Sequence, residues 1–172
     1  MADFHLAFEK TMKNEGGFTL HQVDGDRGGM TFAGISRKFW PDWSGWIFLD
    51  RGEWAAELKP LAKQFYRENF WQKIRGDEIR SQAVADSIYD FAVNAGVGIA
   101  VKVAQRILYI KDDGLVGKQT LTVLNCWVDP DKFLLRYALA KISHYADICG
   151  HDPGQKQFLL GWVNRSLAGV CL

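Results

Sequence analysis

The chain has no long uninterrupted apolar stretch, although 48% of its 172 residues are hydrophobic. A transmembrane helix needs about 20 consecutive apolar residues, so we expect no stable membrane insertion. Residues 1–5 also lack the basic start and the continuous apolar core of a signal peptide. We therefore expect synthesis in the cytoplasm without a signal peptide.

Cysteine is scarce, and its placement is informative. Cys126, Cys149 and Cys171 are odd in number and confined to the last third of the chain, which argues against a disulfide framework. Buried free thiols are the simplest interpretation, with a bridge between Cys149 and Cys171 after export as the alternative. The four histidines have no metal-ligand spacing among themselves or with the cysteines. We therefore predict no metal and no cofactor.

An excess of charge of either sign is missing too. Lysine plus arginine number 21 and aspartate plus glutamate number 20, and no basic block indicates a nucleic-acid partner. No internal repeat is visible either. The length suits one domain of ordinary size, or one domain with a small appended subdomain.

Tryptophan, in contrast, is abundant, with seven in the chain. Trp40, Trp43 and Trp46 cluster around Pro41 and Gly45, in a segment that forms helices poorly. Such rings stack on the apolar faces of sugars in binding grooves, and they fill the core of a small protein equally well. Both interpretations stay open at this stage.

The apolar spacing predicts a mainly helical protein. A helix is expected over residues 4–14 and is ended by Gly16. Possible strands over residues 19–23 and 30–35 form a hairpin, one helical turn covers residues 36–40, and a loop extends to residue 52. Further helices are expected over residues 53–72 with a kink or break at Pro60, and over residues 78–93, 98–110, 118–125, 129–149 and 153–166. The fold class is therefore mainly α (α+β), with about seven helices and a small β-hairpin insertion near residues 18–35.

Glu15 is the first candidate for chemistry. It ends the predicted helix just before two glycines, on the same face as Phe8 and Met12. The partial negative charge of a helix C-terminus and partial burial beside Phe18 both disfavour an ionised carboxylate. A carboxyl group in such a place suits a general acid. The alternative is a solvated glutamate before an ordinary helix stop.

Asp24 and Asp26 follow in a glycine-rich segment. Cleavage of a glycosidic bond usually needs a second carboxylate beside the acid, and either aspartate could fold back toward Glu15. We favour Asp26 for this role, with Arg27 as a partner that keeps a carboxylate ionised and Thr31 as a residue that orients water. The alternative for both aspartates is ordinary turn chemistry, since aspartate next to glycine is typical of turns.

The predicted substrate-binding residues surround these candidates. Glycines in the aspartate-bearing segment allow the backbone to approach a sugar closely. Asn94, at the end of the predicted helix over residues 78–93, either caps that helix or extends its amide into a groove. The full predicted set is Phe18, Arg27, Gly28, Gly29, Asn94 and Gly96.

Four motifs, in this order, together resemble glycoside hydrolase family 108. They are Glu15-Gly-Gly-Phe18, Asp26-Arg-Gly-Gly-Met-Thr31 with Gly34-Ile35, Asp90-Phe-Ala-Val-Asn94-Ala-Gly96, and Gly161-Trp-Val-Asn-Arg165. This family contains lysozyme-like muramidases of phages, prophages and bacteria, some of them labelled secretion activators. Two departures are visible, since Phe18 replaces a tyrosine and Ala33 stands where the family has an aromatic residue. The later set Gln105-x-x-Leu108, Asp113-Gly114-Leu-Val-Gly117 and Thr120 looks like the family's C-terminal peptidoglycan-binding region.

The resemblance implies a lysozyme-like fold, with a catalytic region over residues 1–94. A helical region like a peptidoglycan-binding domain, residues 95–172, is packed on it to give one compact unit. It also implies Glu15 as the catalytic acid that cleaves the β-1,4 bond between N-acetylmuramic acid and N-acetylglucosamine. A lytic transglycosylase, and a non-catalytic protein that binds peptidoglycan or assists secretion, stay open as alternatives. The expected partners are peptidoglycan glycan strands and a holin or export partner, because the substrate lies in the periplasm or cell wall.

Overall fold

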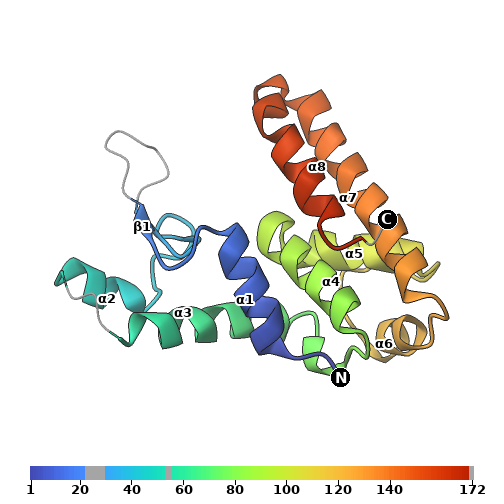
Figure 1. Cartoon of the computed structure of the whole chain (residues 1–172), viewed down its shortest axis with the longest axis horizontal. Coiled ribbons are helices and arrows are strands. Elements are labelled where there is room, and N and C mark those ends of the chain that lie inside the picture. Colours follow the sequence, from blue (N-terminus) through green and yellow to red (C-terminus); the bar gives the residue numbers. More distant parts are fainter. Residues whose placement is uncertain (22–29, 53–55, 171–172) are drawn as a thin grey trace. The chain divides into compact units, whose positions relative to one another are not determined.

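The computed structural model describes residues 1–21, 30–52 and 56–170, and the chain divides into two compact units. The N-terminal unit is Phe4–Gln72, and the C-terminal unit is Met1–Asp3 with Lys73–Leu172. Figure 1 labels the α-helices of both units and the strand β1. The described residues form eight α-helices and one three-stranded antiparallel sheet, which confirms the mainly α class with its small β insertion.

The first helix of the N-terminal unit, α1 (Phe4–Asn14), has the predicted bounds. Its buried face contains Phe4, Phe8 and Met12, which recur every four residues. The ring of Phe8 lies 5.6 Å from that of Phe4 and 5.8 Å from that of Tyr66, centroid to centroid. Truncation of such a buried ring costs about 3–5 kcal/mol. Aromatic contacts therefore hold α1 against the rest of the unit.

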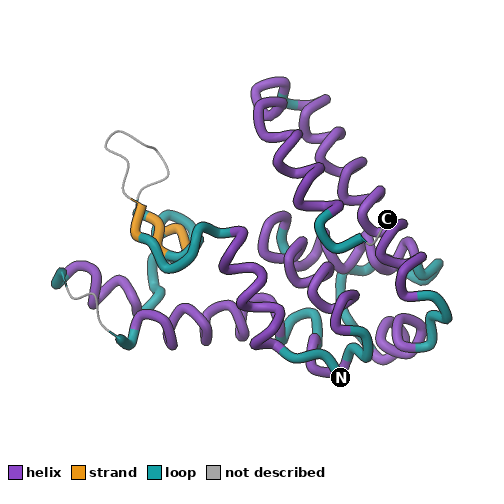
Figure 2. The backbone as a smooth tube through the Cα atoms, in the orientation of Figure 1, coloured by secondary structure: helices purple, strands orange, loops and turns teal. Residues whose placement is uncertain are grey.

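The sheet follows α1 and has the order β1 (Leu20–His21), β2 (Thr31–Phe32) and β3 (Ile35–Ser36). Figure 2 shows its short strands beside the loop that leaves α1. The single strand predicted over residues 30–35 is wrong, because Ala33 and Gly34 turn the chain with φ of 48° and 78°. Positive φ at both central residues characterises a two-residue hairpin turn, for which Asn-Gly is the usual sequence. The sequence did not predict this turn because Ala33, not asparagine, occupies its first central position.

A short helix, α2 (Gly45–Asp50), occupies part of the segment predicted to be a loop. Trp43 and Trp46 are buried and pack edge to face with centroids 5.0 Å apart. The ring of Phe32 in β2 stacks on Trp43 at 5.8 Å. Burial of these rings forms the helix where local propensity does not predict one. Residues 37–39, expected to be helical, form a turn instead.

The helix α3 (Leu58–Tyr66) continues into the π-helical turn η1 (Arg67–Trp71). Pro60 was expected to kink or break a helix over residues 53–72. It lies in the first turn of α3, where a backbone N–H has no intrahelical partner to lose. Trp71 is fully buried, and its ring lies 5.7 Å from that of Phe4.

The C-terminal unit is helical throughout its described part. Its elements are η2 (Gly76–Glu78), α4 (Gln82–Ala95), α5 (Val97–Ile107), α6 (Lys118–Asn125), α7 (Pro130–His151), η3 (Pro153–Phe158) and α8 (Leu159–Leu167). The predicted start of α7 is confirmed, because the Asp129 side chain accepts a hydrogen bond from the Lys132 amide at 2.9 Å. Figure 1 shows α7 and α8 side by side. The buried rings of Phe133 and Tyr137 stack at 5.6 Å in the core.

Candidate functional site

Glu15 lies where α1 turns into a glycine-rich loop. Its amide still donates to the Thr11 carbonyl at 3.0 Å, and the Gly17 amide donates to the Met12 carbonyl at 2.8 Å. Gly16 between them has a φ of 80°. This combination is a Schellman motif, which ends a helix at a residue that only glycine occupies without strain. The motif fixes the backbone from which the half-buried Glu15 side chain projects.

The carboxylate of Glu15 lies against the turn between β2 and β3. A Cβ atom built on Gly34 would lie 2.9 Å from Glu15 Oε2 and 2.6 Å from Tyr66 Oη. The two oxygens are therefore no further apart than the sum of these distances, 5.5 Å. Any larger residue than glycine would collide with one or both side chains.

Tyr66 also contacts this turn. Its buried hydroxyl donates to the Ala33 carbonyl at 2.8 Å, and the Ala33 amide donates to the Thr19 carbonyl at 3.1 Å. A hydroxyl has one proton to donate, so toward other neighbours the Tyr66 oxygen is an acceptor. Glu15, Ala33, Gly34 and Tyr66 form what we call the Glu15 cluster. Sequence reasoning missed Tyr66, because it was one of many apolar residues on the predicted helix over residues 53–72.

Two other predicted site residues belong to the same unit as Glu15. Thr31 is half-buried in β2, paired with His21 of β1 and Ser36 of β3. Phe18 is half-buried as well, with its ring 6.1 Å from that of Phe8. The N-terminal unit therefore contains Glu15, Phe18 and Thr31 together.

The remaining predicted site residues lie elsewhere. Asn94 and Gly96 belong to the C-terminal unit. Asn94 Oδ1 accepts a hydrogen bond from the Tyr145 hydroxyl at 2.7 Å. Gly96 has a φ of 93° and joins α4 to α5. These contacts give both residues a part in the helical packing, and contact with substrate stays a prediction for them. Asp24, Asp26, Arg27, Gly28 and Gly29 lie outside the described residues.

A buried polar network joins the two later sequence motifs. Arg165 of α8 forms a bidentate ion pair with Asp90 of α4, with both N–O distances at 2.9 Å. Lys141 of α7 donates to the Ser87 hydroxyl at 3.2 Å, and burial lowers the pKa of Lys141 to about 8. Burial likewise raises the pKa of Tyr145 to about 12. This network connects α4, α7 and α8 inside the C-terminal unit.

The motif around residues 113–120 is also organised by one buried side chain. Gln105 Nε2 donates to Asp113 Oδ1 and the Leu115 carbonyl at 2.9 Å each, and to Thr120 Oγ1 at 3.2 Å. Its Oε1 accepts from the Gly114 amide at 2.9 Å. The hydrogen bond from Gln105 holds the pKa of the Asp113 carboxyl below its usual value. The motif therefore builds a rigid loop between α5 and α6.

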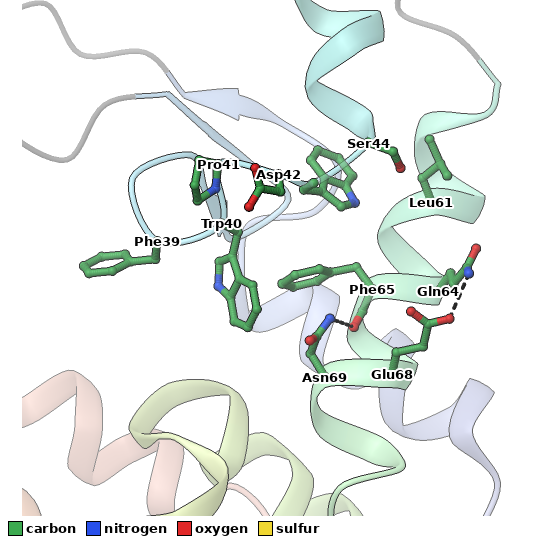
Figure 3. Close-up of a pocket in the computed structure, with 11 residues that line it drawn as sticks. Phe39, Trp40, Pro41, Asp42, Ser44, Leu61, Gln64, Phe65, Glu68 and Asn69 are labelled. Atoms are coloured by element: carbon green, nitrogen blue, oxygen red, sulfur yellow. Dashed lines mark hydrogen bonds between the residues drawn. The ribbon is translucent and has the colours of Figure 1, made fainter.

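A pocket of about 360 Å³ opens in the N-terminal unit, between the segment around Trp40 and the helices α3 and η1 (Figure 3). The ring of Trp40 is 38% exposed and meets that of Phe65 edge to face at 4.8 Å. Glu68 accepts a hydrogen bond from Gln64, and Asp42 lines the opposite side. An exposed ring beside carboxylates and amides is typical of sites for neutral sugars. Trp40 is thus the partly exposed tryptophan of the pocket, while Trp43, which also lines it, and Trp46 are buried.

Within residues 1–21, 30–52 and 56–170, no helix has both the length and the apolarity to cross a bilayer. The same ranges contain no group of three or more histidine, cysteine, aspartate or glutamate residues that could hold a metal ion. Cys126 is an exposed free thiol and Cys149 a buried one, and Cys171 lies outside the described residues.

The chain is similar to a solved structure and matches two protein-family models. A structure of Brucella abortus SagA is similar over 96% of this chain and 94% of its own, with 24% identity and a TM-score of 0.65. This likeness confirms the lysozyme-like fold. No curated protein sequence matches the chain significantly. The family model for a predicted peptidoglycan domain matches residues 99–167, and the model for glycosyl hydrolase 108 matches residues 8–96, just over half of the chain. The chain belongs to glycosyl hydrolase family 108 and carries a C-terminal peptidoglycan domain.

Proposed function

We propose that the protein hydrolyses the β-1,4 bond between N-acetylmuramic acid and N-acetylglucosamine in peptidoglycan, with Glu15 as the general acid. The observation that carries this proposal is the Glu15 cluster. It holds a half-buried carboxyl group against a tight backbone turn, inside the region that matches a glycosyl hydrolase. A fixed position is what proton transfer in a transition state requires.

The chemistry assigned to Glu15 is transfer of its proton to the bridging oxygen of the glycosidic bond. The bond between that oxygen and the anomeric carbon breaks, and the N-acetylglucosamine chain leaves with a new hydroxyl. Water then adds its oxygen to the anomeric carbon, and its released proton restores the carboxyl group. The products are a reducing N-acetylmuramic acid end and a non-reducing N-acetylglucosamine end.

The oxocarbenium-like transition state needs a negative charge or an activated water on the other side. We assign this role to Asp26, with Asp24 as the alternative, and we assign Thr31 the orientation of the water. Replacing Asp26 with asparagine should slow hydrolysis more than the same change at Asp24. The Trp40 pocket supplies a second contact for the glycan strand, through stacking on an apolar sugar face.

The two matched regions suggest a division of labour. Residues 1–94 perform the catalysis and residues 95–172 bind peptidoglycan. The place of action is the cell wall or periplasm, which the protein reaches through a holin or an export partner. Glycan strands are the substrate whether the protein leaves the cytoplasm through a holin or through an export partner.

The test is digestion of purified sacculi, followed by mass spectrometry of the fragments. The wild-type protein should release fragments with reducing N-acetylmuramic acid ends, and Glu15→Gln should release at least a thousandfold fewer while it unfolds at the same urea concentration. Fragments with anhydro-muramic ends would show that the protein is a lytic transglycosylase and would refute hydrolysis. Undiminished release by Glu15→Gln would refute the assignment of the acid, and absence of any release by the wild type would favour a binding or secretion-assisting role.

A further inference from the structure

A groove of about 530 Å³ lies between α5 and α7 in the C-terminal unit. Every residue that lines it falls within the match to a peptidoglycan domain, residues 99–167. Ile99, Val103 and Ile107 are spaced four residues apart on one face of α5, and Ala140 faces the groove from α7. The floor of the groove is therefore apolar.

The sides of this α5–α7 groove are positively charged. Lys102 and Arg106 line it from α5 and Arg136 from α7, against Asp147 as the acidic lining residue. Arg106 forms an ion pair with Asp112 at 2.7 Å, but the two side chains are 65% and 44% exposed, so the pair is weak. Neither Lys102 nor Arg136 is within ion-pair distance of a carboxylate in the part of the chain that the structure describes. Arg106 and, less strongly, Lys102 hold the pKa of the Asp112 carboxyl below its usual value, so Asp112 offsets part of their charge. Arg136 adds a third positive charge to the groove.

Tyr109 lines the groove in an unusual backbone conformation. Its φ is 56°, which costs a residue with a side chain about 1–2 kcal/mol. The ring is 81% exposed, and its hydroxyl accepts a hydrogen bond from Arg136 at 3.5 Å. Strain of this kind persists where the surrounding structure imposes it, and it accumulates at functional sites.

A second hollow of about 670 Å³ lies between α6 and α7. Arg136 lines both spaces. The second hollow adds one cation, Lys132, one carboxylate, Asp129, and three apolar side chains, Val123, Trp127 and Val128, of which Val128 is 98% exposed. Together the linings of the two spaces carry four cations against two carboxylates, so they suit a ligand that has negative charges and small apolar groups.

We infer that the α5–α7 groove binds the stem peptides of peptidoglycan by their carboxylates. Stem peptides combine alanyl methyl groups with glutamyl and C-terminal carboxylates, which match the apolar floor and the cations. The Trp40 pocket has the opposite character, because Asp42 and Glu68 line it and no lysine or arginine is among the described residues of its lining. The neutral glycan and the anionic peptide therefore find different sites. This inference rests on the proposed action on peptidoglycan.

The test compares binding of the full chain to intact sacculi and to sacculi from which an amidase has removed the stem peptides. The chain carries Glu15→Gln, and binding is measured at 4 °C so that cleavage does not interfere. Arg136→Gln should weaken binding to intact sacculi about tenfold, equivalent to one charge-assisted contact. The matched control is Lys156→Gln, which removes one exposed positive charge of the same unit outside the groove. It should bind as the unmodified chain does.

Each outcome decides the question. Weaker binding after amidase treatment, together with a loss in Arg136→Gln but not in Lys156→Gln, supports the inference. Equal binding to both kinds of sacculi, or equal losses in the two variants, overturns it. Equally tight binding to vesicles of phosphatidylglycerol at 150 mM salt would assign the groove to anionic membranes instead. Sacculus digestion is measured separately, so a protein that binds stem peptides but cleaves nothing would refute the proposed function and leave this inference standing.

Discussion

Replacing Gly34 with alanine should disrupt the Glu15 cluster more than any other change of one methyl group. Gly34 has a φ of 78°, in the left-handed region that side chains disfavour. The added Cβ would lie 2.6 Å from Tyr66 Oη and 2.9 Å from Glu15 Oε2, both inside van der Waals contact. The buried Tyr66 ring cannot move freely, so we expect the Glu15 side chain or the turn itself to shift.

The expected cost has two parts. A left-handed conformation costs alanine about 1–2 kcal/mol relative to glycine, and a displaced Tyr66 hydroxyl that loses its bond to the Ala33 carbonyl costs about 1–2 kcal/mol more. The sum is roughly 2–4 kcal/mol. For a chain of this length it should lower the melting temperature by roughly 4–16 °C. A shift of Glu15 by about 1 Å should slow sacculus hydrolysis about a hundredfold.

Gly52→Ala is the matched control for this prediction. Gly52 has a similar φ of 71°, but a Cβ atom there would meet no atom of the described residues within 4 Å. We expect Gly52→Ala to lose about 1–2 kcal/mol from backbone strain alone and to keep its hydrolytic rate. Urea unfolding followed by tryptophan fluorescence, and release of reducing ends from sacculi, measure the two effects. Equal losses of stability and activity in Gly34→Ala and Gly52→Ala would refute the close approach that defines the cluster.

Two further predictions concern the polar network of the C-terminal unit. Lys141 has a folded pKa of about 8 and an unfolded value near 10.5, so the unfolded chain binds more protons between these pH values and stability rises with pH across the window. The unfolding free energy of the wild type minus that of Lys141→Met should therefore increase by about 3 kcal/mol from pH 8 to pH 10.5. If the unfolding free energies of the two proteins instead change in parallel with pH, Lys141 is not a buried amine that titrates in this range. Arg165→Met should cost about 2–4 kcal/mol, because Asp90, 18% exposed, loses its bidentate partner. Adding Asp90→Asn should recover part of that loss in urea unfolding.

Sequence periodicity predicted those helices whose ends are determined locally. The bounds of α1 and α6 were predicted correctly, and α7 begins where Asp129 and Pro130 signal a start. The sequence did not predict α2, because its residues form a helix poorly and burial of Trp43 and Trp46 compensates. It missed β3 as well, because Ala33 occupies a turn position that normally needs asparagine or glycine.

The candidate site was predictable in the same partial way. Glu15 stood out because two glycines follow it, and the structure gives each nearby glycine its own reason. Gly16 and Gly17 provide positive φ for the helix end, and a built Cβ on either has no atom of the described part of the chain within 4 Å. Gly34 provides both positive φ and close approach. Substitution at Gly34 is thus the one of the three that should disturb Glu15 directly. Tyr66 was beyond prediction, because its role depends on a contact with Ala33, which lies 33 residues away in the sequence.

The two pockets support a single account of how such a chain would use its substrate. Peptidoglycan joins a neutral glycan to short anionic peptides, and a protein that must hold it for cleavage gains from contacts with both parts. The Trp40 pocket has carboxylates, amides and an exposed ring, whereas the α5–α7 groove has three cations above an apolar floor. Because like charges repel a wrong ligand as strongly as opposite charges attract the right one, the carboxylates of the Trp40 pocket also exclude the peptide. Strands stripped of stem peptides should therefore be held less tightly than intact strands.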